Sequence, residues 1–417
     1  ALYWPVYDIW HSPEGMQQML TVHNAEWLAS STLGLTSAWL KAEGYGFDYI
    51  SDRQLLADQA KPYRAVIVPR TEHMPLATLR KLLEIADSGQ PVMFLDSLPA
   101  DVPGFFNLPG RQADLRTLLD GREDLVVETR QLLSRLAKTE VVREPLVEAG
   151  LDFIRRTHEQ GHHYFLANLG DKAVDSWVVL GKPFESAVIM DPLTADVGVA
   201  SQRKGRELYL QLLPGETRII RTFKDELVEG PIWPILGKAG FEPVTVNGDW
   251  QVAFVEGGPK LPASFTTSEL VSWVDMADEE ARRFAGTARY SIEFELPDTE
   301  ADDWMIDLGD VRESARVFIN GKMAAALWSV PYLARVDHNL KPGPNRLEIE
   351  VTNLSANRIR DLDIRNVNWK IFHDINFVDQ NYQKFDASKW PLTPSGLLGP
   401  VRLIPMKEVV PPISLQP

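Results

Sequence analysis

The sequence of 417 residues contains no cysteine. Disulfides, thiolate-bound zinc, iron–sulfur clusters and cysteine nucleophiles are therefore excluded by chemistry. The chain also lacks an apolar run near the ~20 residues that cross a bilayer, and no signal-peptide pattern precedes its first strand-like residues. Because chain ends are normally polar and loose, we interpret the apolar start at Ala1 as that of a fragment of a longer polypeptide.

Positive charge is also scarce. There are 43 Lys and Arg residues against 58 Asp and Glu, so the net charge is −15. Such a chain repels phosphate backbones and anionic lipids, and we expect neither nucleic acid nor membrane as a partner. With 44% hydrophobic and 24% charged residues the composition is that of a globular protein. At ~150 residues per domain, the length predicts about three domains.

The first predicted domain, residues 1–140, alternates short apolar runs with amphipathic stretches, which indicates a flavodoxin-like parallel sheet. One helix is expected from about Asn24 to Gly44, with Leu35 on its apolar side, and another from Pro75 to Gly89. A short helical connector is expected over 130–136. The expected strands cover residues 2–7, 47–50, 65–68, 92–95 and 125–127.

Period-two alternation replaces the helical pattern after Pro145 and predicts an all-β remainder. Residues 141–228 are expected to form a small β-sandwich with a hairpin around Glu159-Gln160-Gly161. Residues 229–417 are expected to form a jelly-roll sandwich, in which Asn320-Gly321 closes a tight hairpin. The fold class is therefore multi-domain, α/β followed by all-β.

Parallel sheets usually bind ligands at the carboxyl ends of their strands. The segment after the first strand contains bulky residues and a proline in place of a phosphate-binding glycine loop, so we expect no nucleotide or flavin site. The polar residues that follow the first two strands instead predict a domain interface or an active-site rim. These residues are Asp8, His11, Glu14, Asp52 and Arg53.

Other polar groups do not define a metal or catalytic site. We interpret His158, His162 and His163 as exposed histidines around a hairpin turn, because adjacent strand residues point to opposite faces. Asp361 and Asp363, with Asp374 and Asp379, are interpreted as an acidic loop, since their spacing does not match a calcium-binding loop. Among 58 acidic residues, the sequence selects no carboxylate pair for glycoside hydrolysis.

Aromatic residues are dense in the last section, and sugar rings stack on aromatic rings. Most of these side chains are expected to fill the core between the sheets. Trp328 and Tyr332, in an expected loop, are predicted as a carbohydrate-binding platform.

Five segments in the last section resemble galactose-binding-like domains of glycoside hydrolases, in the order typical of those domains. They are Phe284–Tyr290, Trp304–Val311, Ala315–Lys322, Pro342–Leu347 and Gly396–Val401. Tyr3–Trp10 and Phe47–Asp52 resemble the flavodoxin-like domain that follows the catalytic barrel in α-L-rhamnosidases of glycoside hydrolase family 106. The middle section is similar to the β-domain that joins these two.

The resemblance covers only the carboxyl-terminal part of such an enzyme. It implies that the paired glutamates and a calcium site lie in a preceding barrel of the same polypeptide, for which this chain has no room. No catalytic residue is therefore assigned here, no cofactor or metal is expected in this chain, and whether the chain is itself an enzyme is left open. The resemblance further implies rhamnose-containing carbohydrate as substrate and a periplasmic or extracellular enzyme. The alternative is a stand-alone carbohydrate-binding or scaffold protein.

Overall fold

The computed structural model describes residues 1–417 except 12–25, 204, 372–382 and 413–417. The chain divides into two compact units. The first comprises Ala1–Glu148 with Val179–Lys182, and the second comprises Ala149–Val178 and most of the chain from Pro183 onward. The predicted three domains, 1–140, 141–228 and 229–417, stay a prediction.

The first unit is built on a five-stranded parallel sheet with the order β2-β1-β3-β4-β5. This is the order of flavodoxin-like sheets, and it confirms the expected α/β class. The strands are β1 (Leu2–Tyr3), β2 (Tyr49–Ile50), β3 (Val66–Val68), β4 (Val92–Leu95) and β5 (Val126–Val127).

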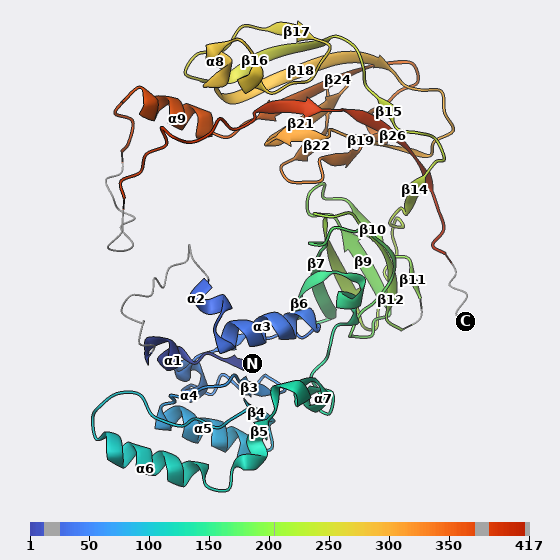
Figure 1. Cartoon of the computed structure of the whole chain (residues 1–417). Helices are drawn as coiled ribbons and strands as arrows, with labels where there is room; N and C mark the ends of the chain where they lie inside the picture. Colours follow the sequence, from blue (N-terminus) through green and yellow to red (C-terminus); the bar gives the residue numbers. More distant parts are fainter. Residues whose placement is uncertain (12–25, 204, 372–382, 413–417) are drawn as a thin grey trace. The chain divides into compact units, whose positions relative to one another are not determined.

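Helices cover both faces of this sheet because alternate strand residues point to opposite sides. Tyr3 and Val66 pack with residues of α4, α5 and α6, whereas Leu2 and Ile67 pack with residues of α3 and α7. Figure 1 shows α3 on one side of the strands and α5 and α6 on the other. The helices are α1 (Val6–His11), α2 (Glu26–Ala29), α3 (Thr32–Ala42), α4 (Asp52–Leu56), α5 (Leu76–Asp87), α6 (Leu108–Leu119) and α7 (Leu132–Leu136).

Two sequence predictions for this unit are wrong. The strand expected to reach Tyr7 ends at Tyr3, because Pro5 cannot donate to a strand ladder and its fixed φ suits the first turn of a helix. The helix expected from Asn24 to Gly44 is interrupted before Ser31, whose hydroxyl accepts a hydrogen bond from the Gly34 N–H at 3.1 Å and so begins α3. Leu35, expected on the apolar side, is 62% exposed.

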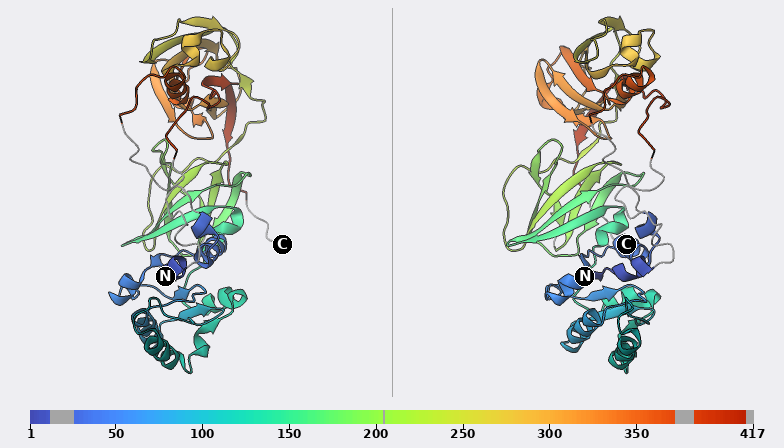
Figure 2. Two further views of the ribbon diagram at one scale, coloured as in Figure 1. Left: turned by 60° about the vertical axis from the view of Figure 1, so that its left-hand side comes forward. Right: turned by 90° about the vertical axis from the view of Figure 1, so that its left-hand side faces the viewer.

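The second unit is built mainly on antiparallel strand pairs, and Figure 2 shows its sheets in two views. Its first part has a five-stranded sheet, β10-β9-β13-β7-β6, and a three-stranded sheet, β11-β12-β8. The hairpin predicted around Glu159 is confirmed between β6 and β7. The strands are β6 (Asp152–His158), β7 (Gly161–Ala167), β8 (Val174–Val179), β9 (Ser186–Met190), β10 (Val197–Val199), β11 (Gln202–Arg203), β12 (Glu207–Leu212) and β13 (Thr217–Phe223).

The remaining strands form a larger sandwich. A six-stranded sheet, β17-β16-β18-β24-β21-β22, and a second sheet, β14-β26-β19-β23 with β15 on β26, enclose one apolar core. Two short helices, α8 (Glu279–Arg282) and α9 (Ala356–Ile364), accompany them. The strands are β14 (Leu236–Lys238), β15 (Val244–Thr245), β16 (Trp250–Gly258), β17 (Phe265–Thr267), β18 (Ala285–Glu295), β19 (Asp303–Asp307), β20 (Asp310–Arg312), β21 (Ser314–Ile319), β22 (Lys322–Leu327), β23 (Leu333–Arg335), β24 (Pro344–Thr352), β25 (Gly396–Gly399) and β26 (Arg402–Glu408).

The core of this sandwich contains a fully enclosed aromatic hydrogen bond. The Trp273 Nε1–H donates to the Tyr290 hydroxyl oxygen at 2.6 Å, and the Leu397 N–H donates to the same oxygen at 3.1 Å. Gly396 passes so close that a Cβ there would collide with Trp273 and Tyr290, and its φ is +101°. This position therefore requires glycine.

The hairpin predicted at Asn320-Gly321 is confirmed between β21 and β22, with positive φ at both turn residues. Among the described residues of the first unit, the longest helices are α5 and α6, with 12 residues each. None of the helices in the described ranges is long and apolar enough to cross a bilayer.

Candidate functional site

The candidate site lies at the carboxyl edge of the parallel sheet, where three strands lead into helices of the first unit. β1 leads through Pro5 into α1, which places Asp8 in the first turn of the helix and His11 at its end. β3 leads into the loop 69–75, and β4 leads into the loop 96–107. Because β1 and β3 are neighbours in the sheet, their loops meet at the position where such sheets bind ligands.

Asp8 joins α1 to the loop after β3. One carboxylate oxygen accepts a hydrogen bond from the His73 N–H at 2.7 Å and lies 3.0 Å from His73 Nδ1. The other oxygen accepts a hydrogen bond from the Glu72 N–H at 2.9 Å. His73 Nδ1 is therefore within hydrogen-bonding distance of the Asp8 carboxylate. The carboxylate therefore fixes both the backbone and the ring of His73.

A second imidazole lies on this pair. The rings of His11 and His73 are stacked, with their centroids 3.8 Å apart. His73 is buried, while His11 is exposed. The site therefore presents the accessible imidazole of His11, which stacks on the buried imidazole of His73.

The loop after β4 completes this cluster through Asp101. The Asp101 backbone carbonyl accepts a hydrogen bond from the Met74 N–H at 3.1 Å. Hydrogen bonds from the Gln112 amide and from the Val102 N–H hold the pKa of the Asp101 carboxyl below its usual value. Asp101 is therefore a fixed negative charge close to the histidine pair.

This arrangement orients imidazoles but does not resemble a metal centre. Across the described residues, no three His, Asp or Glu side chains are grouped so that they could hold a metal ion. An imidazole held by a carboxylate can exchange a hydrogen bond or a proton with a hydroxyl group. The arrangement at this edge can therefore form a hydrogen bond with a hydroxyl group.

The other residues predicted for this rim have different surroundings. The Asp52 carboxylate, in the first turn of α4, accepts hydrogen bonds from the Tyr3 hydroxyl at 2.9 Å and the Thr78 hydroxyl at 2.5 Å. Burial, together with the negative charge of Asp52, raises the pKa of Tyr3 well above its usual value. Asp52 thus joins β1 to α5, whereas Arg53 is exposed. Glu14 lies outside the described residues, so the predicted rim or interface stays a prediction.

The carbohydrate platform predicted in the second unit consists of two residues with different surroundings. Trp328 is 70% exposed, as stacking requires. Tyr332 is only 9% exposed, packs in the sandwich core, and donates its hydroxyl proton to the Glu313 carbonyl. Of these two residues, only Trp328 therefore has a freely accessible ring, and carbohydrate binding there stays a prediction.

The structure corrects two further interpretations in the second unit. His162 is not an exposed turn residue but is 7% exposed, while His158 and His163 share the other face, with ring centroids 4.5 Å apart. Asp361 and Asp363 lie in helix α9 rather than in a loop. Their carboxylates bind side chains of the same region, including Arg365. Asp374 and Asp379 lie outside the described residues.

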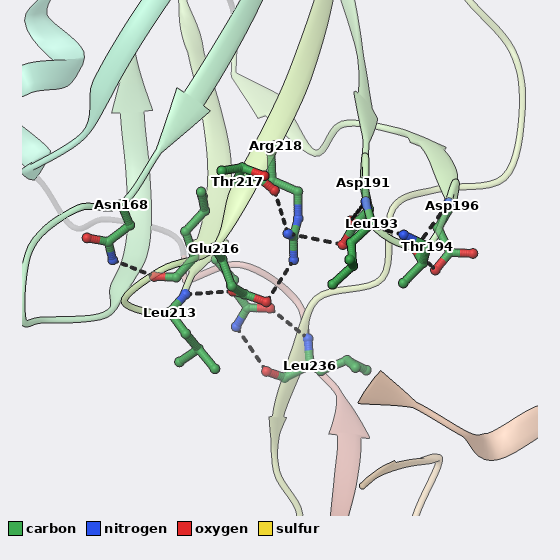
Figure 3. A network of polar contacts seen from close by, with 12 residues as sticks. Asn168, Asp191, Leu193, Thr194, Asp196, Leu213, Glu216, Thr217, Arg218 and Leu236 are labelled. Carbon is green, nitrogen blue, oxygen red and sulfur yellow. Dashed lines mark hydrogen bonds and ion pairs between the residues drawn. The ribbon is translucent and has the colours of Figure 1, made fainter. Parts of the chain in front are cut away.

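A polar network lies where β9 ends and β13 begins in the second unit (Figure 3). The Arg218 guanidinium lies 3.1 Å from Asp191 and 3.3 Å from Glu216, and it donates to the Thr217 carbonyl at 2.7 Å. Glu216 in turn accepts a hydrogen bond from the Leu213 N–H at 2.6 Å. These side chains are largely buried and bind one another, so the network stabilises two turns.

Sequence reasoning missed His73 and Asp101, although both follow strands of the sheet. Asp8 and His73 are 65 positions apart, and no spacing pattern connects them. The signal that was available is topological, because the segments after β1, β3 and β4 all emerge at one edge.

Comparisons with known proteins relate the chain to glycoside hydrolases. No family model matches it. A putative β-glucuronidase of Formosa agariphila is 29% identical over 248 residues, which are 52% of this chain and 21% of that protein. The structure of a rhamnosidase from Novosphingobium sp. PP1Y matches with a TM-score of 0.59 at 23% identity, over 86% of this chain and 36% of that one. The chain thus has the fold of part of a rhamnosidase and spans about a fifth to a third of these proteins.

Proposed function

We propose that this chain is the carboxyl-terminal, non-catalytic part of a glycoside hydrolase resembling α-L-rhamnosidases, and that it supports the catalytic barrel. The fold similarity carries this proposal, because it extends over 86% of this chain but only 36% of the rhamnosidase. The similarity to the putative β-glucuronidase, over 21% of that protein, supports the same class.

The fold of the described residues is consistent with a non-catalytic role in this proposal. Hydrolysis of a glycosidic bond requires two carboxyl groups on opposite sides of that bond, commonly at the top of a (β/α)₈ barrel. The parallel sheet described here has five strands and is open. In this proposal the carboxylate pair, with any calcium ion, belongs to a barrel elsewhere in the same polypeptide.

The proposal also defines partners and location. The substrate is a rhamnose-containing carbohydrate, and the partner of this chain is the amino-terminal barrel. The edge that carries Asp8 and His11 serves as an interface with that barrel or as the rim of its active site. The enzyme acts in the periplasm or outside the cell.

The test is hydrolysis of an aryl α-L-rhamnoside by this chain and by the native polypeptide, whose length is read from its intact mass. We expect no turnover by this chain and turnover by a longer native polypeptide. Turnover by this chain that persists after removal of trace contaminating hydrolase contradicts the non-catalytic assignment. A native mass equal to that of this chain contradicts the barrel partner.

A second candidate function is a stand-alone carbohydrate-binding or scaffold protein, which the exposed indole of Trp328 favours. In that case the native mass matches this chain, and saccharide binding is lost in the Trp328→Ala variant.

A further inference from the structure

A pocket of about 510 Å³ opens beside the histidine pair, within the first unit. Residues from α1, from the start of α5 and from the loop before α6 line it, so it lies at the carboxyl edge of the sheet. Its main lining residues are Tyr7, Trp10, His11, Leu76, Pro103 and Arg111.

One wall of the pocket is aromatic and open. Trp10 is 63% exposed although it lines the pocket, so a face of its indole is accessible. Tyr7 supports it edge-on, with ring centroids 5.5 Å apart. Leu76 and Pro103 add aliphatic surface. An open aromatic face with aliphatic surroundings suits the C–H face of a sugar ring.

The opposite loop is held rigidly. Arg111 of α6 donates to the backbone carbonyls of Phe106 at 2.7 Å, Pro103 at 2.6 Å and Gly104 at 2.5 Å. Each of the three guanidinium nitrogens therefore donates to one carbonyl, and Arg111 braces the pocket wall. Ordering this wall costs little on binding, because it is already fixed in the free protein.

The polar end of the pocket can bond to a hydroxyl group. His11 lines the pocket and stacks on His73, which Asp8 holds in place. Arg111 also lines the pocket and keeps its positive charge while it donates to backbone carbonyls. A ligand hydroxyl group can bond to the His11 imidazole here.

We infer that this pocket is a binding site for a pyranose ring, which stacks on Trp10 and bonds through a hydroxyl group to His11. This inference does not rest on the proposed function, since it concerns binding by this chain alone. A single shallow stacking site predicts a dissociation constant of roughly 1 mM.

The experiment titrates this chain with methyl α-L-rhamnoside and methyl β-D-glucoside, following tryptophan indole N–H resonances by NMR. We expect saturable shifts of the Trp10 resonance, assigned from its loss in Trp10→Phe, with at least one neutral glycoside.

Variants locate the site. Trp10→Ala should weaken binding about tenfold, and His11→Ala should weaken it while leaving the indole in place. Phe105→Ala is the matched control, because this almost fully exposed ring is not among the residues that line the pocket. Trp328→Ala controls for the predicted platform in the second unit. Both controls should bind as the parent does.

Several results overturn the inference. They are the absence of a shift with either glycoside, and unchanged affinity in both Trp10→Ala and His11→Ala. Loss of binding in Trp328→Ala alone would place the sugar elsewhere. If Trp10→Ala fails to fold, the Trp10 shifts and His11→Ala decide the question. Binding by this chain can fail while the native polypeptide still hydrolyses rhamnosides, so failure here is distinguishable from failure of the proposed function.

Discussion

Replacing Asp8 should loosen α1 from the loop after β3. The carboxylate accepts the N–H groups of Glu72 and His73 and contacts the His73 ring, and its side chain is a quarter exposed. Hydrogen bonds to a charged group contribute about 1.5 to 3 kcal/mol each, and less where water competes. Counting about 1 kcal/mol for the exposed Glu72 contact and about 1.5 kcal/mol for each His73 contact gives ~4 kcal/mol for Asp8→Ala.

Asp8→Asn should be costly as well. Both carboxylate oxygens of Asp8 accept hydrogen bonds from N–H groups, and the amide nitrogen that replaces one of them cannot accept a hydrogen bond. We expect a loss of ~2 to 3 kcal/mol for this variant, measured by urea denaturation. Amide hydrogen exchange gives the local test, since the Glu72 and His73 N–H groups should lose protection in both variants. Asp48→Asn is the control, because the Asp48 side chain accepts one exposed hydrogen bond from Tyr63. Unchanged exchange at Glu72 and His73, with stability within ~0.5 kcal/mol of the parent, would refute this reasoning.

Three further predictions concern the second unit. Tyr290→Phe leaves the Trp273 and Leu397 N–H groups buried without an acceptor and should cost ~2 to 5 kcal/mol in urea denaturation; a loss below ~1 kcal/mol would argue against the enclosed hydrogen bonds. Burial raises the pKa of Tyr290 to about 12, so the unfolded chain loses the hydroxyl proton at a lower pH than the folded chain does. The free energy of unfolding should therefore fall as the pH rises from ~10 to ~12, and it should fall less in Tyr290→Phe. Trp328→Ala should change stability by less than ~0.5 kcal/mol, whereas a loss of ~3 kcal/mol would assign this indole to packing.

The sequence predicted best where one periodicity dominates. β4 was expected at 92–95 and is found at Val92–Leu95, because all four residues are buried between two helical layers. The helix expected from Pro75 to Gly89 is α5 (Leu76–Asp87), whose apolar stripe includes Leu79 and Leu82. In these segments local pattern and tertiary packing require the same structure.

Predictions failed where one residue outweighs the pattern. The apolar run from Leu2 to Tyr7 reads as one strand, but Pro5 divides it into a strand and a helix. Helix α6 was not predicted at all, because Pro109 and Gly110 in its first turn resemble a loop. The candidate site depends on contacts between Asp8 and residues more than 60 positions away, which only the strand order reveals.

The contact between Asp8 and the loop after β3 gives this sheet an anion of its own. Where neighbouring strands of an open parallel sheet diverge, backbone N–H groups commonly face an external phosphate or carboxylate. Here the N–H groups of Glu72 and His73 already face the Asp8 carboxylate, which is covalently part of the chain. Shortening this side chain, as in Asp8→Gly, would turn an internal ligand into a vacancy. Acetate or formate should then restore part of the lost stability in that variant and leave the parent unchanged.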